Sequence, residues 1–154
     1  MFFYNVCSNP HTPARMAIQV VIDTNVFVAA LRSTTGAAHV LFNQIGSTTK
    51  WELNLSPALF LEYEEQAKRI AAEVNLSFQD IDKLLERIAT ESNKWLISDP
   101  REPRSRDPDD DFVLDLAIGA GVQYIITFNT GNFAGAGPRG IRVIRPGDFL
   151  PLAS

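Results

Sequence analysis

The sequence predicts an α/β fold with a mainly parallel central sheet and helices on both faces, in a Rossmann-like arrangement of three layers. Short apolar runs rich in β-branched residues, such as Ile18–Ile22 and Gln123–Thr127, are typical of strands that are buried on both faces. The segments between these runs carry helix start and stop signals. Strands that alternate with helices along a chain favour a parallel sheet.

The first half of the chain supplies two strands and two short helices. Ile18–Ile22 forms the first expected strand, and Trp51–Leu55 forms the second. Between them, Val26–Arg32 and Ala37–Ile45 have the composition of short helices, and Gly46 is the stop signal of the latter. We therefore expect two short helices to connect the first two strands.

Two longer helices are expected next, each with its own start signal. Ser56 is a typical N-cap and Pro57 suits the first helical position, so one helix should run to about residue 74. Ser77 with Asp80 three residues later resembles a capping box, which predicts a second helix to about residue 90. These signals are local and do not depend on the rest of the fold.

The second half of the chain continues the alternation. We expect a weak strand at Trp95–Ile97, a polar loop at Asp99–Pro108 and a helix at Asp109–Ala120. Strands at Gln123–Thr127 and Ile141–Ile144 complete the sheet.

Composition places the chain among single-domain globular proteins. Its 154 residues are 45% hydrophobic, enough for one core without disulfides, and it has one cysteine, Cys7. No apolar run approaches the roughly 20 residues of a transmembrane helix, and no signal peptide is recognisable, so we expect a cytoplasmic protein without a membrane partner. The net charge of −4 excludes a bulk basic surface for nucleic acid.

We expect three parts along the chain. Residues 1–15 form an N-terminal extension of unknown role, broken by prolines and followed by a candidate start at Met16. Residues 16–146 form a single domain, and residues 147–154 form a C-terminal tail.

Oxygen-bearing side chains follow the strands of the predicted sheet. Ligands bind beyond the carboxyl ends of strands in open α/β sheets. Asp23 and Asn25 follow the first strand, Ser56 follows the second, and Thr127 and Asn129 stand at the end of the fourth. Asp23 also suits a plain N-cap of the next helix, and its position alone favours that interpretation.

The acidic start of the helix at Asp109–Ala120 has one carboxylate on the inward face. On a helical wheel Asp110 lies in the middle of that face, whereas Asp111 and Asp115 lie about 90° or more to its side. A carboxylate on a buried face needs a partner, because burying it alone is costly. Attraction of acids to a helix N-terminus explains the flanking aspartates but not Asp110.

The helix that begins at Ser56 carries three glutamates. Glu62 and Glu64 flank its apolar stripe on opposite sides, and Glu65 points away. Periodicity therefore excludes Glu65 and leaves both of the others open.

Carboxylates gathered in this way indicate a divalent cation. Clustered carboxylates raise one another's pKa unless a cation is present. Oxygen ligands without His or Cys suit Mg²⁺ or Mn²⁺, and these ions support cleavage of phosphodiester bonds.

Three segments in this order resemble the PIN-domain family, and in particular the toxins of bacterial toxin–antitoxin pairs. They are VIDTNVFVAAL at 21–31, SPALFLEYEE at 56–65 and RDPDDDFVLDLAIGAGVQYIITFNTGNF at 106–133, and the similarity extends over about 17–144. The resemblance implies a PIN-like fold and a Mg²⁺- or Mn²⁺-dependent endoribonuclease. It selects Asp23, Glu62 and Asp110 as the catalytic metal ligands, supported by hydrogen bonds from Asn25, Ser56 and Thr127.

The chain departs from the family pattern after the fourth strand. Many members have a fourth acid there, whereas this chain has Asn129 and, three residues later, Asn132. A neutral amide holds a second Mg²⁺ less well than a carboxylate, so we expect one tightly held ion and a second that arrives with the substrate. A degenerate PIN domain that binds RNA or a protein without catalysis is the alternative.

Contact with RNA must come from local cations. The candidates precede the acidic helix or follow the Asn129 loop, and they are Arg101, Arg104, Arg106 and Arg139. Balancing nearby acids is an equally good explanation for these arginines. The resemblance further implies a homodimer and a cognate antitoxin that blocks the site.

Overall fold

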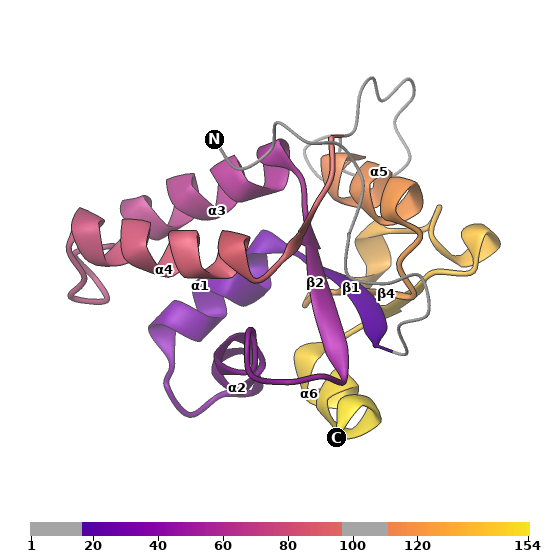
Figure 1. The fold of residues 1–154 in the computed structure, drawn as a ribbon, viewed down its shortest axis with the longest axis horizontal. Helices are drawn as coiled ribbons and strands as arrows, with labels where there is room; N and C mark the ends of the chain where they lie inside the picture. Colours follow the sequence, from indigo (N-terminus) through magenta and orange to yellow (C-terminus); the bar gives the residue numbers. More distant parts are fainter. Residues whose placement is uncertain (1–16, 97–110) are drawn as a thin grey trace.

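A five-stranded parallel sheet forms the centre of the computed structural model, which describes residues 17–96 and 111–154 (Figure 1). The strand order is β3-β2-β1-β4-β5, and each neighbouring pair is parallel. The strands are β1 Ile18–Ile22, β2 Trp51–Leu55, β3 Asn93–Lys94, β4 Tyr124–Ile126 and β5 Arg142–Ile144. The predicted α/β class with a parallel sheet is confirmed.

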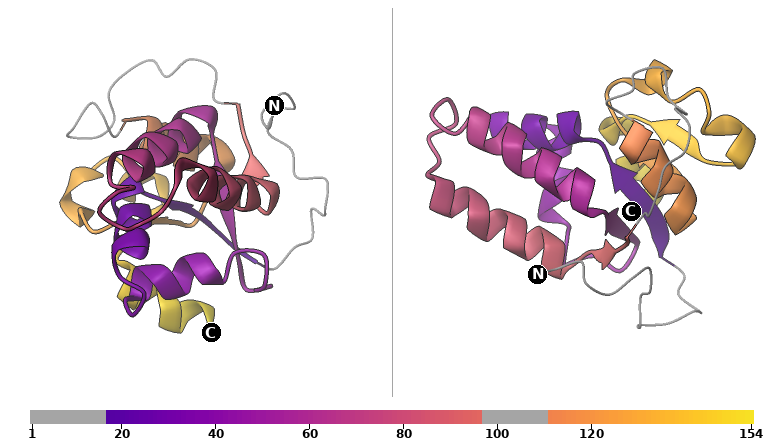
Figure 2. Two further views of the ribbon diagram at one scale, coloured as in Figure 1. Left: turned by 90° about the vertical axis from the view of Figure 1, so that its left-hand side faces the viewer. Right: turned by 90° about the horizontal axis from the view of Figure 1, so that it is seen from above.

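Helices cover both faces of this sheet. On one side lie α1 (Thr24–Arg32), α3 (Pro57–Arg69) and α4 (Phe78–Thr90), with α2 (Ala37–Asn43) packed against α1. On the other side lies α5 (Asp111–Ala120), which contacts β1, β2 and β4 (Figure 2).

The register of the strands aligns their carboxyl ends. Val20 in β1 is paired with Leu53 in β2 and with Tyr124 in β4, and Ile22 is paired with Ile126. The residues that follow Ile22, Leu55 and Ile126 therefore emerge at one edge of the sheet, which is the edge predicted to carry the site.

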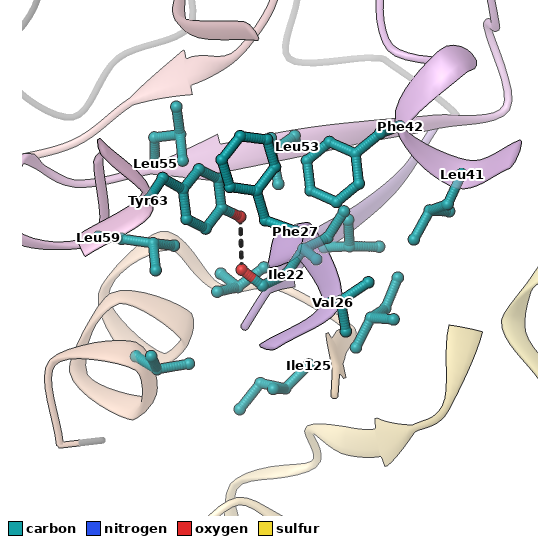
Figure 3. Close-up of a cluster of buried hydrophobic side chains, with 14 of the residues drawn as sticks. Ile22, Val26, Phe27, Leu41, Phe42, Leu53, Leu55, Leu59, Tyr63 and Ile125 are labelled. Atoms are coloured by element: carbon teal, nitrogen blue, oxygen red, sulfur yellow. Dashed lines mark hydrogen bonds between the residues drawn. The ribbon is translucent and has the colours of Figure 1, made fainter. Parts of the chain in front are cut away.

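Three aromatic rings form the centre of the core on the α1 side of the sheet (Figure 3). The ring centroid of Phe27 lies 4.7 Å from that of Tyr63 and 5.2 Å from that of Phe42. Tyr63 is fully buried, and its hydroxyl donates a hydrogen bond to the carbonyl oxygen of Ile22 at 2.5 Å. This bond joins α3 to the last residue of β1, directly before Asp23.

The start signals of the two long helices act as predicted. The Ser56 hydroxyl accepts a hydrogen bond from the backbone N–H of Leu59 at 3.3 Å, with Pro57 at the first helical position. Ser77 and Asp80 form a reciprocal capping box, each side chain accepting from the other residue's backbone N–H at 3.0 Å.

Two elements differ from the prediction. The helix α3 ends at Arg69 rather than near residue 74, because the chain turns back there and passes through a left-handed residue, Asn75 (φ 58°), before α4 begins. The third strand is Asn93–Lys94 rather than Trp95–Ile97, although Trp95 still donates its backbone N–H to Leu55. The sequence favoured the apolar residues, but this strand is an edge strand in which the side chain of Asn93 binds Gln19 of β1 and Glu52 of β2.

The C-terminal residues are helical. The short helix α6 (Pro146–Phe149) continues into a 3₁₀ turn at Leu150–Ala153, and it includes part of the expected tail at 147–154. Phe149 is fully buried against Trp51 and Tyr124, the first residues of β2 and β4. None of the helices in the described part of the chain is long and apolar enough to cross a membrane.

Candidate functional site

A cavity of about 590 Å³ opens at the carboxyl edge of the sheet. Its walls come from the end of β1, from α1, α3 and α5, and from the segment after β4. The described residues that line it are Asp23, Thr24, Asn25, Val28, Ala29, Arg32, Ser33, Glu62, Gln66, Phe112, Asn129 and Asn132.

Asp23 caps α1 and also lines the cavity, so its role as an N-cap is compatible with a role as a metal ligand. It is 4% exposed. One carboxylate oxygen accepts the backbone N–H of Thr24 at 2.8 Å, and the other accepts the hydroxyl of Thr127 at 2.8 Å. The carboxylate is thus fixed from both ends while it faces the cavity.

Thr127 connects two segments of the site through its hydroxyl. Besides donating to Asp23, the hydroxyl oxygen accepts hydrogen bonds from Asn25 Nδ2 at 3.3 Å and from the backbone N–H of Asn129 at 3.0 Å. Asn25 Oδ1 also accepts the backbone N–H of Phe128 at 3.3 Å. The start of α1 and the segment after β4 are therefore held together beside the Asp23 carboxylate. Asn25 and Thr127 lie next to this carboxylate, where we expected supporting polar residues.

Tertiary structure separates the three glutamates of α3. Glu62 lines the cavity with Asp23, where Gln66 donates to its carboxylate at 3.2 Å. Glu64 instead binds Lys68 at 2.9 Å, and Glu65 lies 3.4 Å from Arg69 on the exposed face. The packing of α3 thus brings together the two acids that the resemblance selected.

Burial raises the pKa of Asp23 above its usual value, and the negative charge of Glu62 raises it further. The hydrogen bonds from Thr127 and Thr24 act in the opposite direction. A carboxylate that is held in place by donors but destabilised by desolvation and a second carboxylate is better accommodated when a cation is bound.

Tyr63 is a part of the site that sequence reasoning did not identify. Its place in the apolar stripe of α3 indicated only a core residue, yet its hydroxyl binds the carbonyl of Ile22 (Figure 3). Burial raises the pKa of Tyr63 well above its usual value, and the nearby charge of Asp23 adds to this effect, so the phenol stays a donor. A tyrosine adjacent to the selected glutamate was the signal available in the sequence.

Other predicted site residues have different positions. Ser56 is buried and does not line the cavity; its hydroxyl caps α3, the helix that carries Glu62. Arg139 is exposed and lies outside the cavity lining. The acid Asp110 and the arginines Arg101, Arg104 and Arg106 lie outside the described residues.

Asp115 corrects the helical-wheel prediction. It is 5% exposed, although the wheel placed it to the side of the inward face. Val113, Leu114, Leu116 and Ala117 are all fully buried, so α5 is enclosed over more of its circumference than the apolar stripe indicated.

The donor chemistry of the lining is uniform. Within residues 17–96 and 111–154, the lining contains oxygen and amide donors and no His or Cys. The Thr24 hydroxyl oxygen is buried at the cavity and has no hydrogen-bond partner among the residues that the structure describes. Over the same residues, no three His, Cys, Asp or Glu side chains gather as a metal-holding group, and Asp110 is not among these residues.

A protein family model matches most of the chain. The family model described as "PIN domain" matches residues 19–131, which include β1 after Ile18, β2 to β4, and every described cavity-lining residue except Asn132. No curated protein matches the chain.

Proposed function

Since the chain belongs to the PIN-domain family, whose members are generally nucleases, we propose that it is a Mg²⁺- or Mn²⁺-dependent endoribonuclease that hydrolyses RNA phosphodiester bonds. One observation supports this most directly. The carboxylates of Asp23 and Glu62, 39 residues apart in the sequence, line one cavity at the carboxyl edge of a parallel sheet.

The residues present suit a hard divalent cation. The acids supply carboxylate oxygens, and the neighbouring Asn25, Asn129 and Thr24 offer further oxygen atoms. The Thr24 hydroxyl oxygen, buried without a hydrogen bond in the structure, is a polar atom that a bound ligand or its water would satisfy.

Each residue has a distinct part in the proposed mechanism. Asp23 and Glu62, with Asp110 as the third acid, would hold the cation, which when bound activates water and stabilises charge on the phosphate. Thr127 and the Thr24 N–H keep the Asp23 carboxylate oriented, and Tyr63 fixes the strand end that carries it. Among the described lining residues there is no histidine, so the carboxylates or bulk water must carry the proton.

The amides after β4 limit the number of tightly held ions. Asn129 and Asn132 both line the cavity. Because amide oxygens are neutral, they attract a second Mg²⁺ less than carboxylates would. We therefore propose one tightly held ion in the free protein and a second that arrives with the phosphate of the substrate.

The toxin role belongs to the same proposal. The cognate antitoxin and the homodimer stay predictions of the resemblance. Leu61 on α3 and Phe78 on α4 are 59% and 57% exposed, and they are apolar side chains that such a partner would cover.

The test is an RNA cleavage assay with Mg²⁺ or Mn²⁺ on the purified wild type and on Asp23→Asn. We expect cleavage by the wild type, loss of cleavage with EDTA, and a loss of about three orders of magnitude in Asp23→Asn. Titration calorimetry with Mn²⁺ should count one tight site.

Circular dichroism of Asp23→Asn is the control, because asparagine is also a good N-cap and should preserve α1. Cleavage that survives both EDTA and Asp23→Asn would refute the metal site. An inactive wild type that still binds RNA would favour the degenerate, non-catalytic alternative.

A further inference from the structure

A stripe of α1 extends the cavity away from the acids. Asn25, Val28, Ala29 and Arg32 follow the i, i+3, i+4 and i+7 spacing of one helix face, and all of them line the cavity. The helix has nine residues, so about 13 Å separates Asp23 from the far end at Arg32. The cavity is therefore longer than a metal site requires.

The two ends of this stripe have opposite charge. Asp23 and Glu62 stand at one end, and Arg32 is the one cation among the described lining residues. Between them the floor is apolar, formed by Val28 and Ala29, and the aromatic side chain of Phe112 also lines the cavity. An apolar floor with an aromatic ring and a terminal cation suits a nucleotide, whose base is apolar on its faces and whose phosphate is an anion.

The guanidinium of Arg32 is already held in one orientation. Its Nε and Nη2 donate to the two carboxylate oxygens of Glu73 at 2.7 and 3.1 Å. Nη1 makes no hydrogen bond to any residue that the structure describes. Since a guanidinium has five N–H donors, this pairing leaves an edge available for an anion.

We propose that Arg32 binds a second backbone phosphate of the RNA strand whose scissile phosphate is held at the acids, so that α1 lies along a nucleotide subsite. The inference rests on the proposed nuclease function and identifies where the substrate lies. The anionic strand then enters with its scissile phosphate at the metal and the second phosphate at the guanidinium. Because Arg32 and Asp23 are at opposite ends of α1, the contribution of Arg32 is to binding rather than to the chemical step.

Arg69 offers a matched control. It is also a helical arginine paired with a glutamate, Glu65, at 3.4 Å, and it is 63% exposed compared with 50% for Arg32. It does not line the cavity. Arg32→Gln and Arg69→Gln thus make the same change of charge, inside and outside the proposed subsite.

The experiment measures binding of a fluorescein-labelled single-stranded RNA octamer by anisotropy, in Ca²⁺, between 50 and 300 mM KCl. We expect Arg32→Gln to weaken binding about tenfold at low salt and to reduce the slope of log affinity against log salt by about 0.7, the value for one lost phosphate contact. Arg32→Lys should fall between wild type and Arg32→Gln, because it keeps the charge but loses the planar fork. In cleavage assays with Mg²⁺, Arg32→Gln should raise KM more than it lowers kcat.

Arg69→Gln should bind and cleave like the wild type. The inference fails if Arg32→Gln keeps the affinity and salt slope of a wild type that cleaves RNA, and in that case the nuclease function stands. It also fails if Arg69→Gln loses as much affinity as Arg32→Gln, because the effect would then be one of overall charge. A wild type that neither binds nor cleaves RNA refutes both the nuclease proposal and the subsite.

Discussion

Two polar clusters lie on the same sheet, and they differ in how the charge of their acidic side chains is stabilised. The first is the site cluster of Asp23, Asn25, Glu62 and Thr127 at the carboxyl edge. The second, which we name the strand network, joins side chains of β1, β2, β3 and Trp95. Its members are Gln19, Glu52, Asn54, Asn93 and Trp95.

In the strand network the polar groups bind one another. Asn93 Nδ2 donates to Gln19 Oε1 at 3.0 Å and to Glu52 Oε1 at 3.1 Å. Gln19 Nε2 also donates to Glu52 at 3.0 Å, and the indole N–H of Trp95 donates to Asn54 at 2.8 Å. The acid of this cluster is thus surrounded by amide donors, which stabilise its charge.

In the site cluster two carboxylates, Asp23 and Glu62, face one cavity, and their negative charges repel each other. Burial and Glu62 raise the pKa of Asp23, and the Thr24 hydroxyl oxygen has no hydrogen bond to any residue in the described part of the chain. The comparison shows that polar groups on a sheet are not by themselves a site. An acid that is satisfied by neighbours supports the fold, whereas an acid that is oriented but left electrostatically uncompensated is suited to a ligand.

The largest effect that tests this comparison is on activity. Thr127→Val removes the hydroxyl that orients Asp23 and accepts from Asn25 and Asn129. We expect cleavage to fall about 10- to 100-fold, the usual cost of losing a group that orients a metal ligand. Steady-state cleavage rates across a Mn²⁺ series measure this, and part of the loss should recover at high Mn²⁺. Thr127→Ser, which keeps the hydroxyl, should stay close to wild type; equal losses in both variants would contradict the role of the hydroxyl.

The next effect is on stability alone. Gln19 and Asn93 both donate to Oε1 of Glu52, so Glu52→Gln keeps an oxygen that can accept both bonds but removes the negative charge that strengthens them, and we expect a loss of about 1 kcal/mol in the free energy of unfolding. Urea denaturation measures it. Cleavage per folded molecule should stay unchanged, because Glu52 is absent from the cavity lining. A drop in the cleavage rate without a loss of stability would show that the strand network serves the site.

The smallest effect has the opposite sign. Asp23 has a raised pKa in the folded protein, so its ionisation destabilises the metal-free fold as pH rises through that pKa. In EDTA at pH 7.5, Asp23→Asn should therefore melt at a higher temperature than the wild type. The difference should shrink as the pH is lowered to the raised pKa of Asp23 and below it, because the wild-type carboxyl becomes protonated. Because the two proteins share all other carboxyls, the difference between their melting temperatures at each pH reports the titration of Asp23. A lower melting temperature for Asp23→Asn at pH 7.5 would contradict the view that the Asp23 charge destabilises the metal-free fold.

Much of the fold could be predicted from local signals. The strands Ile18–Ile22 and Trp51–Leu55 have the predicted bounds, and the caps at Ser56 and Ser77 form as expected. These features depend on residues within about four positions of one another, which is the range over which caps and strand composition act. The edge strand Asn93–Lys94 was misplaced because the polar side chain of Asn93 is satisfied by Gln19 and Glu52, which are far from it in the sequence.

The sequence by itself determined where the acids stand along the chain and that parallel strands would bring their ends to one edge. Only the tertiary structure decided which side chains share the cavity. Periodicity did not distinguish Glu62 from Glu64. In the structure, the packing of α3 over the sheet directs Glu62 to the cavity, and Glu64 pairs with Lys68. The same packing brought the Tyr63 hydroxyl to Ile22. Which side chains point into a cavity depends on packing between segments that are tens of residues apart, and local sequence periodicity does not contain that information.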